Sequence, residues 1–77
     1  MPIELDTKGL SCPLPILKVK KAMTRLEDND ILCVESTDPG SVKDFDVFCQ
    51  TNGHDLLKSI CENDIFIFHI RKNHNKS

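Results

Sequence analysis

Strand-like and helix-like hydrophobic spacings alternate along this sequence, and few small folds accept the order in which they come. Apolar residues separated by one polar residue indicate strands, whereas apolar residues at steps of three and four indicate helices. Strands are predicted over residues 3–6, 31–36, 56–61 and 65–71, and helices over residues 13–26 and 41–52. Two helices cannot cover both faces of a four-stranded sheet in a chain of 77 residues. We therefore predict a two-layer α/β (α+β) sandwich in the order βαβαββ, with a mixed sheet and both helices on one face.

Local signals set the ends of these elements. Ser41 follows a proline-glycine break and is expected to cap the second helix, which Asn52 and Gly53 would end. The apolar positions of that helix include Val42. The strand over 56–61 is predicted on weaker grounds, because neither alternate set of its residues is apolar.

The last predicted strand, residues 65–71, is apolar on both faces. Its alternating sets are Phe66, Phe68 and Ile70 on one side and Ile65, Ile67 and His69 on the other. Only one set can face the helices, so the other is expected to form an apolar patch on the open side of the sheet, where a partner could dock.

We expect a single domain over residues 1–77, with a polar and frayed tail over 72–77. The first residues lack the pattern of a secretory signal, and no run approaches the roughly 18 apolar residues of a membrane span, so a cytoplasmic protein without membrane contact is expected. A net charge of −2 and the lack of Trp and Tyr argue against direct nucleic-acid binding. The four cysteines form no Cys-x-x-Cys pair, so we expect free thiols and neither a metal nor a cofactor.

One segment, which begins at residue 9 and reads Gly-Leu-Ser-Cys-Pro-Leu-Pro, carries chemical information. Cys12 directly precedes the first predicted helix, and Pro13 and Pro15 fall in its first turn, where missing N–H groups cost little. A thiol at this place lies at the positive end of the helix dipole, which favours the thiolate. The prolines remove two donors from the turn while Leu14 and Ile16 keep theirs, so we expect a modest effect.

Cys12 has no partner thiol close to it in the sequence. The residue three positions on is Pro15, where a thioredoxin-type motif would have its second cysteine. A sulfur atom placed on Cys12 would therefore stay until another protein removed it, as a carrier requires. Cys12 could instead only cap the helix, although Ser, Thr, Asp or Asn would do so better, and the residues alone leave both interpretations open.

The pattern Leu5-Asp6-x-x-Gly9-Leu10-x-Cys12-Pro13-x-Pro15 resembles the Cys-Pro-x-Pro signature of the TusA/SirA-like sulfur-carrier proteins. The similarity continues through Thr37-Asp38-Pro39, the Phe48 region, Gly53-His54-x-Leu56 and Ile70-Arg71-Lys72. It covers essentially the whole chain in the same order, and that family has a two-layer βαβαββ fold.

The resemblance implies a sulfurtransferase-like carrier that acts with partner proteins and not as a stand-alone enzyme. Cys12 would accept sulfur as a persulfide from a cysteine desulfurase and pass it to an acceptor protein of a sulfur relay. In one branch of the family the sulfur goes to 2-thiouridine in tRNA, and in others to molybdenum-cofactor synthesis or sulfur oxidation. We take tRNA thiolation as the leading expectation.

Several residues near the motif are expected to support it. Asp6 would hold the loop by hydrogen bonding, and Gly9 would supply backbone freedom for the entry to Cys12. Lys8 is a candidate charged helper of the thiol. The basic residues considered for partner docking are Lys8, Lys18, Lys21 and Arg25. For the last three, a solvated helix face is an equally good interpretation.

The remaining thiols and histidines have simpler expected roles. Cys33 and Cys49 stand where small buried hydrophobes are expected, and Cys61 would matter as a redox partner if it lay exposed beside Cys12. His54 is expected to be structural, and His69 has no evident chemical partner.

Two other functions fit the residues. One is a non-catalytic module that binds a protein or RNA through the basic helix face or the apolar sheet face, with Cys12 dispensable. The other is a redox or selenium-linked thiol protein. Thiol reactivity against pH and salt-sensitive RNA binding would separate the first from a carrier, and identification of the partners would separate the second.

Overall fold

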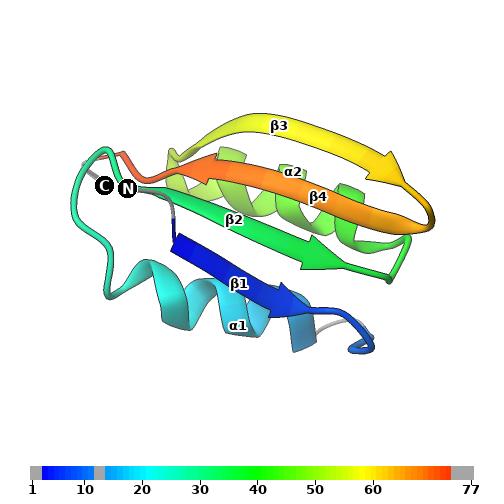
Figure 1. Cartoon of the computed structure of the whole chain (residues 1–77). Coiled ribbons are helices and arrows are strands. Elements are labelled where there is room, and N and C mark those ends of the chain that lie inside the picture. Colours follow the sequence, from blue (N-terminus) through cyan, green and yellow to red (C-terminus); the bar gives the residue numbers. More distant parts are fainter. Residues whose placement is uncertain (1–2, 12–13, 74–77) are drawn as a thin grey trace.

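The computed structural model describes residues 3–11 and 14–73 as a two-layer α/β sandwich (Figure 1). Its elements are β1 (Ile3–Thr7), α1 (Leu14–Met23), β2 (Ile31–Ser36), α2 (Ser41–Asn52), β3 (Asp55–Glu62) and β4 (Ile65–Arg71). The predicted βαβαββ order is confirmed, and the strands β2 and β4 have the bounds expected from the sequence.

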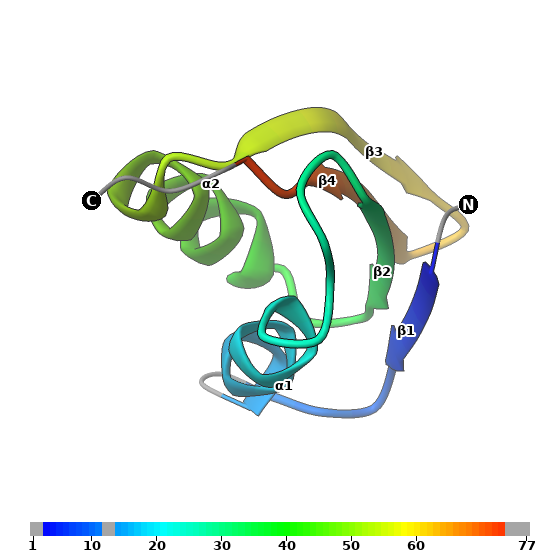
Figure 2. The ribbon, with the colours of Figure 1, turned by 90° about the vertical axis from the view of Figure 1, so that its left-hand side faces the viewer.

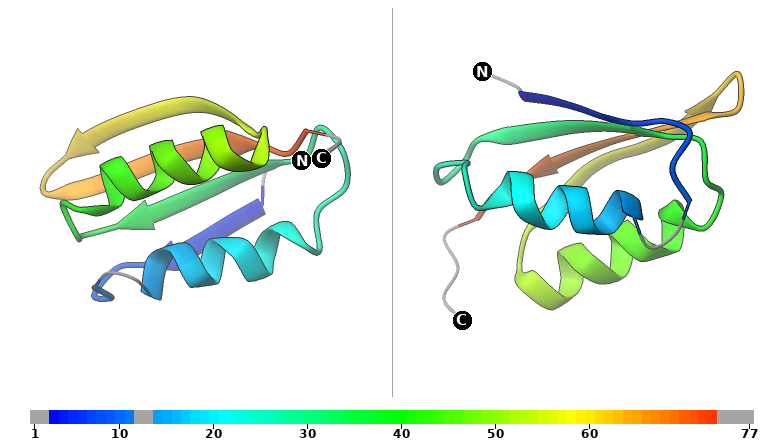
Figure 3. Two further views of the ribbon diagram at one scale, coloured as in Figure 1. Left: turned by 180° about the vertical axis from the view of Figure 1, so that it is seen from behind. Right: turned by 90° about the horizontal axis from the view of Figure 1, so that it is seen from below.

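The four strands form one mixed sheet in the order β1-β2-β4-β3. β1 pairs with β2 in parallel, and β4 lies antiparallel between β2 and β3. Both helices cover the same face of this sheet, as Figures 2 and 3 show. The prediction of helices on one face is therefore confirmed.

The core lies between the helices and the two inner strands. Its fully buried strand residues are Leu32, Val34, Phe68 and Ile70, and its helix residues include Val19, Met23, Phe45, Phe48 and Cys49. Phe45 of α2 meets Phe68 of β4 edge to face, with ring centroids 4.5 Å apart. Burial of these side chains away from water is the main force that holds the two layers together.

The structure decides which set of β4 residues faces the helices. Phe68 and Ile70 are buried, and Phe66 packs against the core. Ile65, Ile67 and His69 lie on the opposite, open face, where they are half-buried. This is the apolar patch expected on the open side of the sheet.

Helix α1 is shorter than predicted and ends at Met23 instead of residue 26. The next residues form turns, in which the Leu26 N–H donates to the Met23 carbonyl at 3.2 Å. Leu26 is nevertheless buried, so its apolar spacing reflects burial in the core and not helical structure.

The predicted cap of α2 is wrong. Gly40 takes the N-cap position and supplies no side-chain hydrogen bond, while Ser41 is the first residue of the helix and donates its hydroxyl to the Asp38 carbonyl at 2.6 Å. The expected end is correct, because Gly53 adopts a left-handed φ of 76° after Asn52. Val42, expected on the apolar side, is 40% exposed.

A register shift explains why the pattern of β3 is weak. Leu56 pairs with Ile70 and Lys58 pairs with His69, so an extra residue, Leu57, stands between the paired positions. Such a bulge reverses which residues face the core from that point on. Leu56 packs on the core, whereas Ile60 lies beyond the bulge and is exposed.

Lys72 and Asn73 are held in place and are not part of a frayed tail. The Lys72 ammonium donates to the Met23 and Leu26 carbonyls at 2.8 and 2.7 Å, at the C-terminal end of α1. The Asn73 N–H donates to Nδ1 of His54 at 3.3 Å. The prediction of a frayed tail is thus wrong for these two residues, and residues 74–77 lie outside the described part of the chain.

Replacing Lys72 with methionine should lower the free energy of unfolding by about 1–3 kcal/mol, because two carbonyls at a helix end lose a charged donor. The urea midpoint should fall while the slope of the transition stays the same. Lys43→Met, at an exposed lysine of α2, is the control and should change stability by less than about 0.5 kcal/mol. Equal effects of the two substitutions would contradict the role given to Lys72.

His54 should make the fold less stable in mild acid. Burial lowers the pKa of this imidazole below its ordinary value of 6.5, and the positive charge of Lys72 lowers it further. The unfolded chain therefore binds the proton more readily, so the stability that His54 contributes is complete above pH 6.5 and is lost as the pH falls through the folded-state pKa. Urea unfolding at a series of pH values should show this loss, and His54→Gln should reduce it. An unchanged pH profile in the variant would refute the assignment.

Candidate functional site

One end of the sheet gathers the segments around the Cys-Pro-x-Pro motif. β1 and β2 are parallel and both end there, and the N-terminal ends of α1 and α2 follow them (Figures 1 and 3). Cys12 and Pro13 lie outside the described residues, but their neighbours Ser11 and Leu14 are both exposed. The chain thus runs over the surface on each side of the motif's first two residues.

The loop between β1 and α1 is fixed by local hydrogen bonds. The Asp6 carboxylate accepts the Lys8 N–H at 2.9 Å, which is the loop-holding contact expected of Asp6. Gly9 has a φ of 84°, a conformation that favours glycine, and its N–H donates to the Thr37 hydroxyl at 2.9 Å. This last bond ties the loop before α1 to the loop before α2.

The Lys8 ammonium is occupied by two carboxylates. Its Nζ lies 2.7 Å from Glu35 Oε1 and 3.6 Å from Asp6 Oδ1. The hydrogen bond to Glu35 raises the pKa of Lys8, and the Lys8 backbone N–H lowers the pKa of Asp6. Lys8 was expected to be a charged helper of the thiol, but its charge is largely offset by these neighbours.

The first turn of α1 offers fewer donors than expected. Pro15, the second residue of α1, is buried and has no N–H. The Leu14 N–H, expected to remain available, donates to the Ser11 carbonyl at 2.9 Å. Of the two donors expected in this turn, only the Ile16 N–H is left, and the helix dipole adds to its effect on an anion near this helix end.

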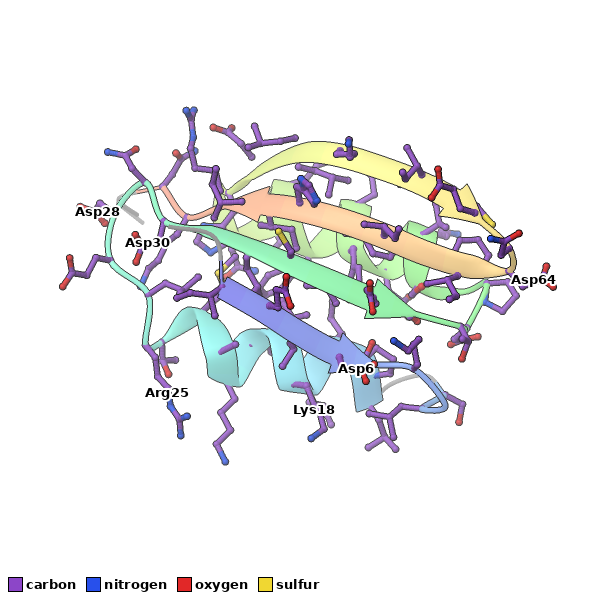
Figure 4. All side chains as sticks on the ribbon, viewed as in Figure 1. Asp6, Lys18, Arg25, Asp28, Asp30 and Asp64 are labelled. Atoms are coloured by element: carbon purple, nitrogen blue, oxygen red, sulfur yellow. The ribbon has the colours of Figure 1, made fainter. Side chains whose placement is uncertain are left out.

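The basic residues expected on α1 do not form one stripe next to the motif. Lys18 and Lys21 are exposed on the helix, while Arg25 lies beyond its end at Met23. Figure 4 shows Lys18 on α1 and Arg25 beyond its end, both pointing away from the sheet but well apart from each other. With a rise of about 1.5 Å per residue, the end of α1 at Met23 is roughly 13 Å along the axis from Leu14, and Arg25 lies beyond it, so Lys18 is the basic residue nearest the start of the helix.

Leu14 and Leu17 are exposed apolar residues that the sequence pattern did not single out. Their side chains are 45% and 49% exposed, and both belong to the first half of α1. Ile16, Val19 and Met23 mark the buried face of the helix by their spacing, and Leu14 and Leu17 do not belong to that set. This departure from the spacing was the sequence signal that could have predicted their exposure. An exposed apolar pair beside the motif suits contact with a partner protein.

A groove of about 360 Å³ runs between the two helices. Its lining includes Ile16, Lys20, Lys43, Asp44, Val47 and Phe48. Its apolar floor and its two lysines make it a second candidate contact surface on the helix side of the molecule. Lys20 and Lys43 were not among the predicted docking residues, because their convergence depends on how α1 packs against α2.

The other three thiols differ in exposure. Cys49 is buried, and this burial raises its pKa to about 11. Cys33, expected to be buried, is only half-buried on the open face of the sheet, where burial and then Glu4 raise its pKa. Cys61 is exposed on β3. Cys33 and Cys49 are thus held in the thiol form, which is a poor nucleophile.

Among residues 3–11 and 14–73, no group of three His, Cys, Asp or Glu side chains is arranged to hold a metal ion. Within the same residues, neither helix is long and apolar enough to cross a membrane.

Comparisons with known proteins agree with this arrangement. The family model described as sulfurtransferase TusA matches residues 3–72. The sulfur carrier protein TusA of Allochromatium vinosum is 49% identical over 69 residues, which are 90% of this chain and 91% of that protein. The crystal structure of a SirA-like protein from Desulfitobacterium hafniense has the same fold, with a TM-score of 0.83 at 21% identity over 96% of this chain and all of that one. The chain therefore belongs to the TusA family of sulfur carrier proteins.

Proposed function

We propose that Cys12 carries sulfur as a persulfide, received from a cysteine desulfurase and handed to an acceptor protein that leads to 2-thiouridine in tRNA. The observation that carries the proposal is the position of Cys12 in the sequence, two residues before the start of α1 and between the exposed residues Ser11 and Leu14. Membership of the TusA family supports the carrier role.

The transfer is an exchange at sulfur. The Cys12 thiolate attacks the outer sulfur of the donor's persulfide, a new S–S bond forms, and the bond between the donor's two sulfurs breaks. The donor cysteine leaves as a thiolate that takes up a proton. The acceptor's thiolate then attacks the outer sulfur on Cys12 in the same way, so Cys12 returns to its starting state without an external oxidant or reductant.

Retention of the cargo requires that no second thiol attack the Cys12 persulfide. An adjacent thiol would attack the Cys12 persulfide and release its sulfur as hydrogen sulfide. Pro15 stands where a Cys-x-x-Cys motif would put such a thiol. Cys49 is buried with a pKa raised to about 11, so it cannot serve as a resolving nucleophile.

The surface of α1 next to the motif fits a partner with an acidic and partly apolar site. Leu14 and Leu17 offer apolar contact, and the exposed Lys18 adds a positive charge one turn from the helix start. Charge of this kind speeds the encounter of two proteins more than it strengthens the complex. Arg25 lies too far along the chain to act at the same place.

Removing the Cys12 thiol should abolish sulfur loading. When the protein is incubated with a cysteine desulfurase and cysteine, intact mass spectrometry should show the addition of one sulfur atom, and Cys12→Ser should show none. Cys61→Ser removes an exposed thiol elsewhere and serves as the matched control, which should load normally. Equal loading of the Cys12→Ser variant would contradict the proposal. It would also be contradicted if the alkylation rate of Cys12 against pH matched that of a free cysteine and the protein bound RNA in a salt-sensitive way.

The tRNA destination needs its own measurement. In cells that lack this chain, the level of 2-thiouridine in tRNA should fall, and wild-type protein but not Cys12→Ser should restore it. Normal 2-thiouridine in such cells, together with normal loading in vitro, would leave the carrier role standing and reject the destination.

Reversing the charge of Lys18 should slow sulfur loading. Lys18→Glu should lower the second-order rate constant with the desulfurase by roughly three- to tenfold at low salt, with less effect at high salt. Arg25→Glu makes the same change of charge beyond the C-terminal end of α1 and should alter the rate much less. If both variants behave alike, only overall charge matters and Lys18 is not a docking residue.

A further inference from the structure

Among residues 3–11 and 14–73, no strand pairs with the outer edge of β3. β3 is the last strand in the sheet order β1-β2-β4-β3, and Figures 1 and 2 show it at the margin of the sheet. From Lys58 to Glu62 every residue of β3 is exposed. An edge of this kind presents a row of backbone N–H and C=O groups to which another strand can add.

The turn after β3 determines which backbone groups point outward. Two residues, Asn63 and Asp64, connect β3 to β4, and both have positive φ. Glu62 and Ile65 flank this two-residue turn as a register pair, and in such hairpins the flanking pair exchanges its hydrogen bonds. Because the pattern alternates along an antiparallel pair, the residues whose N–H and C=O groups face β4 are Glu62, Ile60 and Lys58. The groups of Ser59 and Cys61 therefore face outward.

The side chains on the open face of this segment are self-complementary. Lys58, Ile60 and Glu62 share that face, with a cation and an anion at equal distances on either side of an apolar residue. Among the ion pairs of the described residues, none involves Lys58 or Glu62. The Ile60 side chain is 37% exposed.

We propose that two copies of this chain associate through β3, antiparallel and about a twofold axis at Ile60. In this register Lys58 of each copy lies opposite Glu62 of the other, and Ile60 lies opposite its own counterpart. Ser59 lies opposite Cys61 of the second copy, so that the outward backbone groups of both strands meet as hydrogen-bonded pairs. The two sheets then continue as a single sheet of eight strands, with the isologous contact that a twofold axis requires.

The backbone allows this register and the side chains select it. With the axis at Ile60, the outward groups of Ser59 and Cys61 pair, and Ile60 forms a non-hydrogen-bonded pair in which the two side chains lie close together. The charges select the register about Ile60, because Lys58 lies opposite Glu62 in both symmetry-related pairs only there. A shift to any neighbouring register would lose both of these ion pairs. Lysine on an edge strand usually opposes strand addition, but here the second copy supplies the matching carboxylate.

The opposite edge of the sheet stays accessible in this assembly. β1, which leads into the segment that contains Cys12, is the opposite edge strand. Association through β3 therefore leaves that edge unpaired and does not depend on the function proposed for Cys12.

Sedimentation of the full chain with Cys61 kept reduced tests the proposal. Monomer and dimer should exchange with concentration, and raised salt should favour the monomer. Lys58→Glu places Glu opposite Glu, and Glu62→Lys places Lys opposite Lys, so each alone should weaken association by about tenfold or more. An equimolar mixture of these two variants should associate again, because every cross-strand pair in the mixed dimer has opposite charges.

Two control variants test whether the association occurs through the outer edge of β3. Lys18→Glu makes the same charge change on α1 and should leave association unaltered. Ser59→Pro removes an outward N–H without touching the pairs with β4, so it should give a folded monomer. A wild-type chain that stays monomeric at all concentrations would overturn the proposal. The β3 edge would then be available for pairing with a strand of another protein. Dimers that persist equally in Lys58→Glu, Glu62→Lys and Ser59→Pro would overturn it too.

Discussion

Phe45 and Phe68 meet edge to face at the centre of the molecule and join helix α2 to the inner strand β4. In a chain of 77 residues, most of the hydrophobic stabilisation must come from one thin layer between the helices and the sheet. Each inner strand therefore buries only one of its faces. The open face, the outer edges and the ends of the strands are left for contacts with other molecules.

The candidate site follows from this arrangement. A parallel β1–β2 pair brings the ends of both strands, and the starts of both helices, to one end of the sheet. The bond from Gly9 to Thr37 then holds the loop before α1 against the loop before α2. The segments on either side of the Cys-Pro-x-Pro motif are thus held at the surface on a firm base.

Much of the fold could be predicted because strong local patterns match the final burial. β2 and β4 have clean alternation between turns, and their bounds agree with the prediction. The bulge at Leu57 was not predicted, because pairing with β4 and not local spacing decides it. The anchoring of Lys72 was also missed, since its acceptors lie 46 and 49 residues away in sequence. For the site, the motif indicated Cys12, whose role stays a prediction, while the exposure of Leu14 and the pairing of Lys8 with Glu35 needed the packed structure.

The anchoring of the last described residues has a practical meaning for how the chain can be extended. Lys72 and Asn73 are hydrogen-bonded beside the C-terminal ends of both helices, whereas the β1–α1 loop lies at the other end of the sheet (Figure 1). A purification tag, a fluorescent reporter or a second domain joined after Asn73 would leave the molecule from the side remote from that loop. Fusions of this kind keep the added part away from the β1–α1 loop, while a fusion that displaced the Lys72 ammonium would loosen the end of α1.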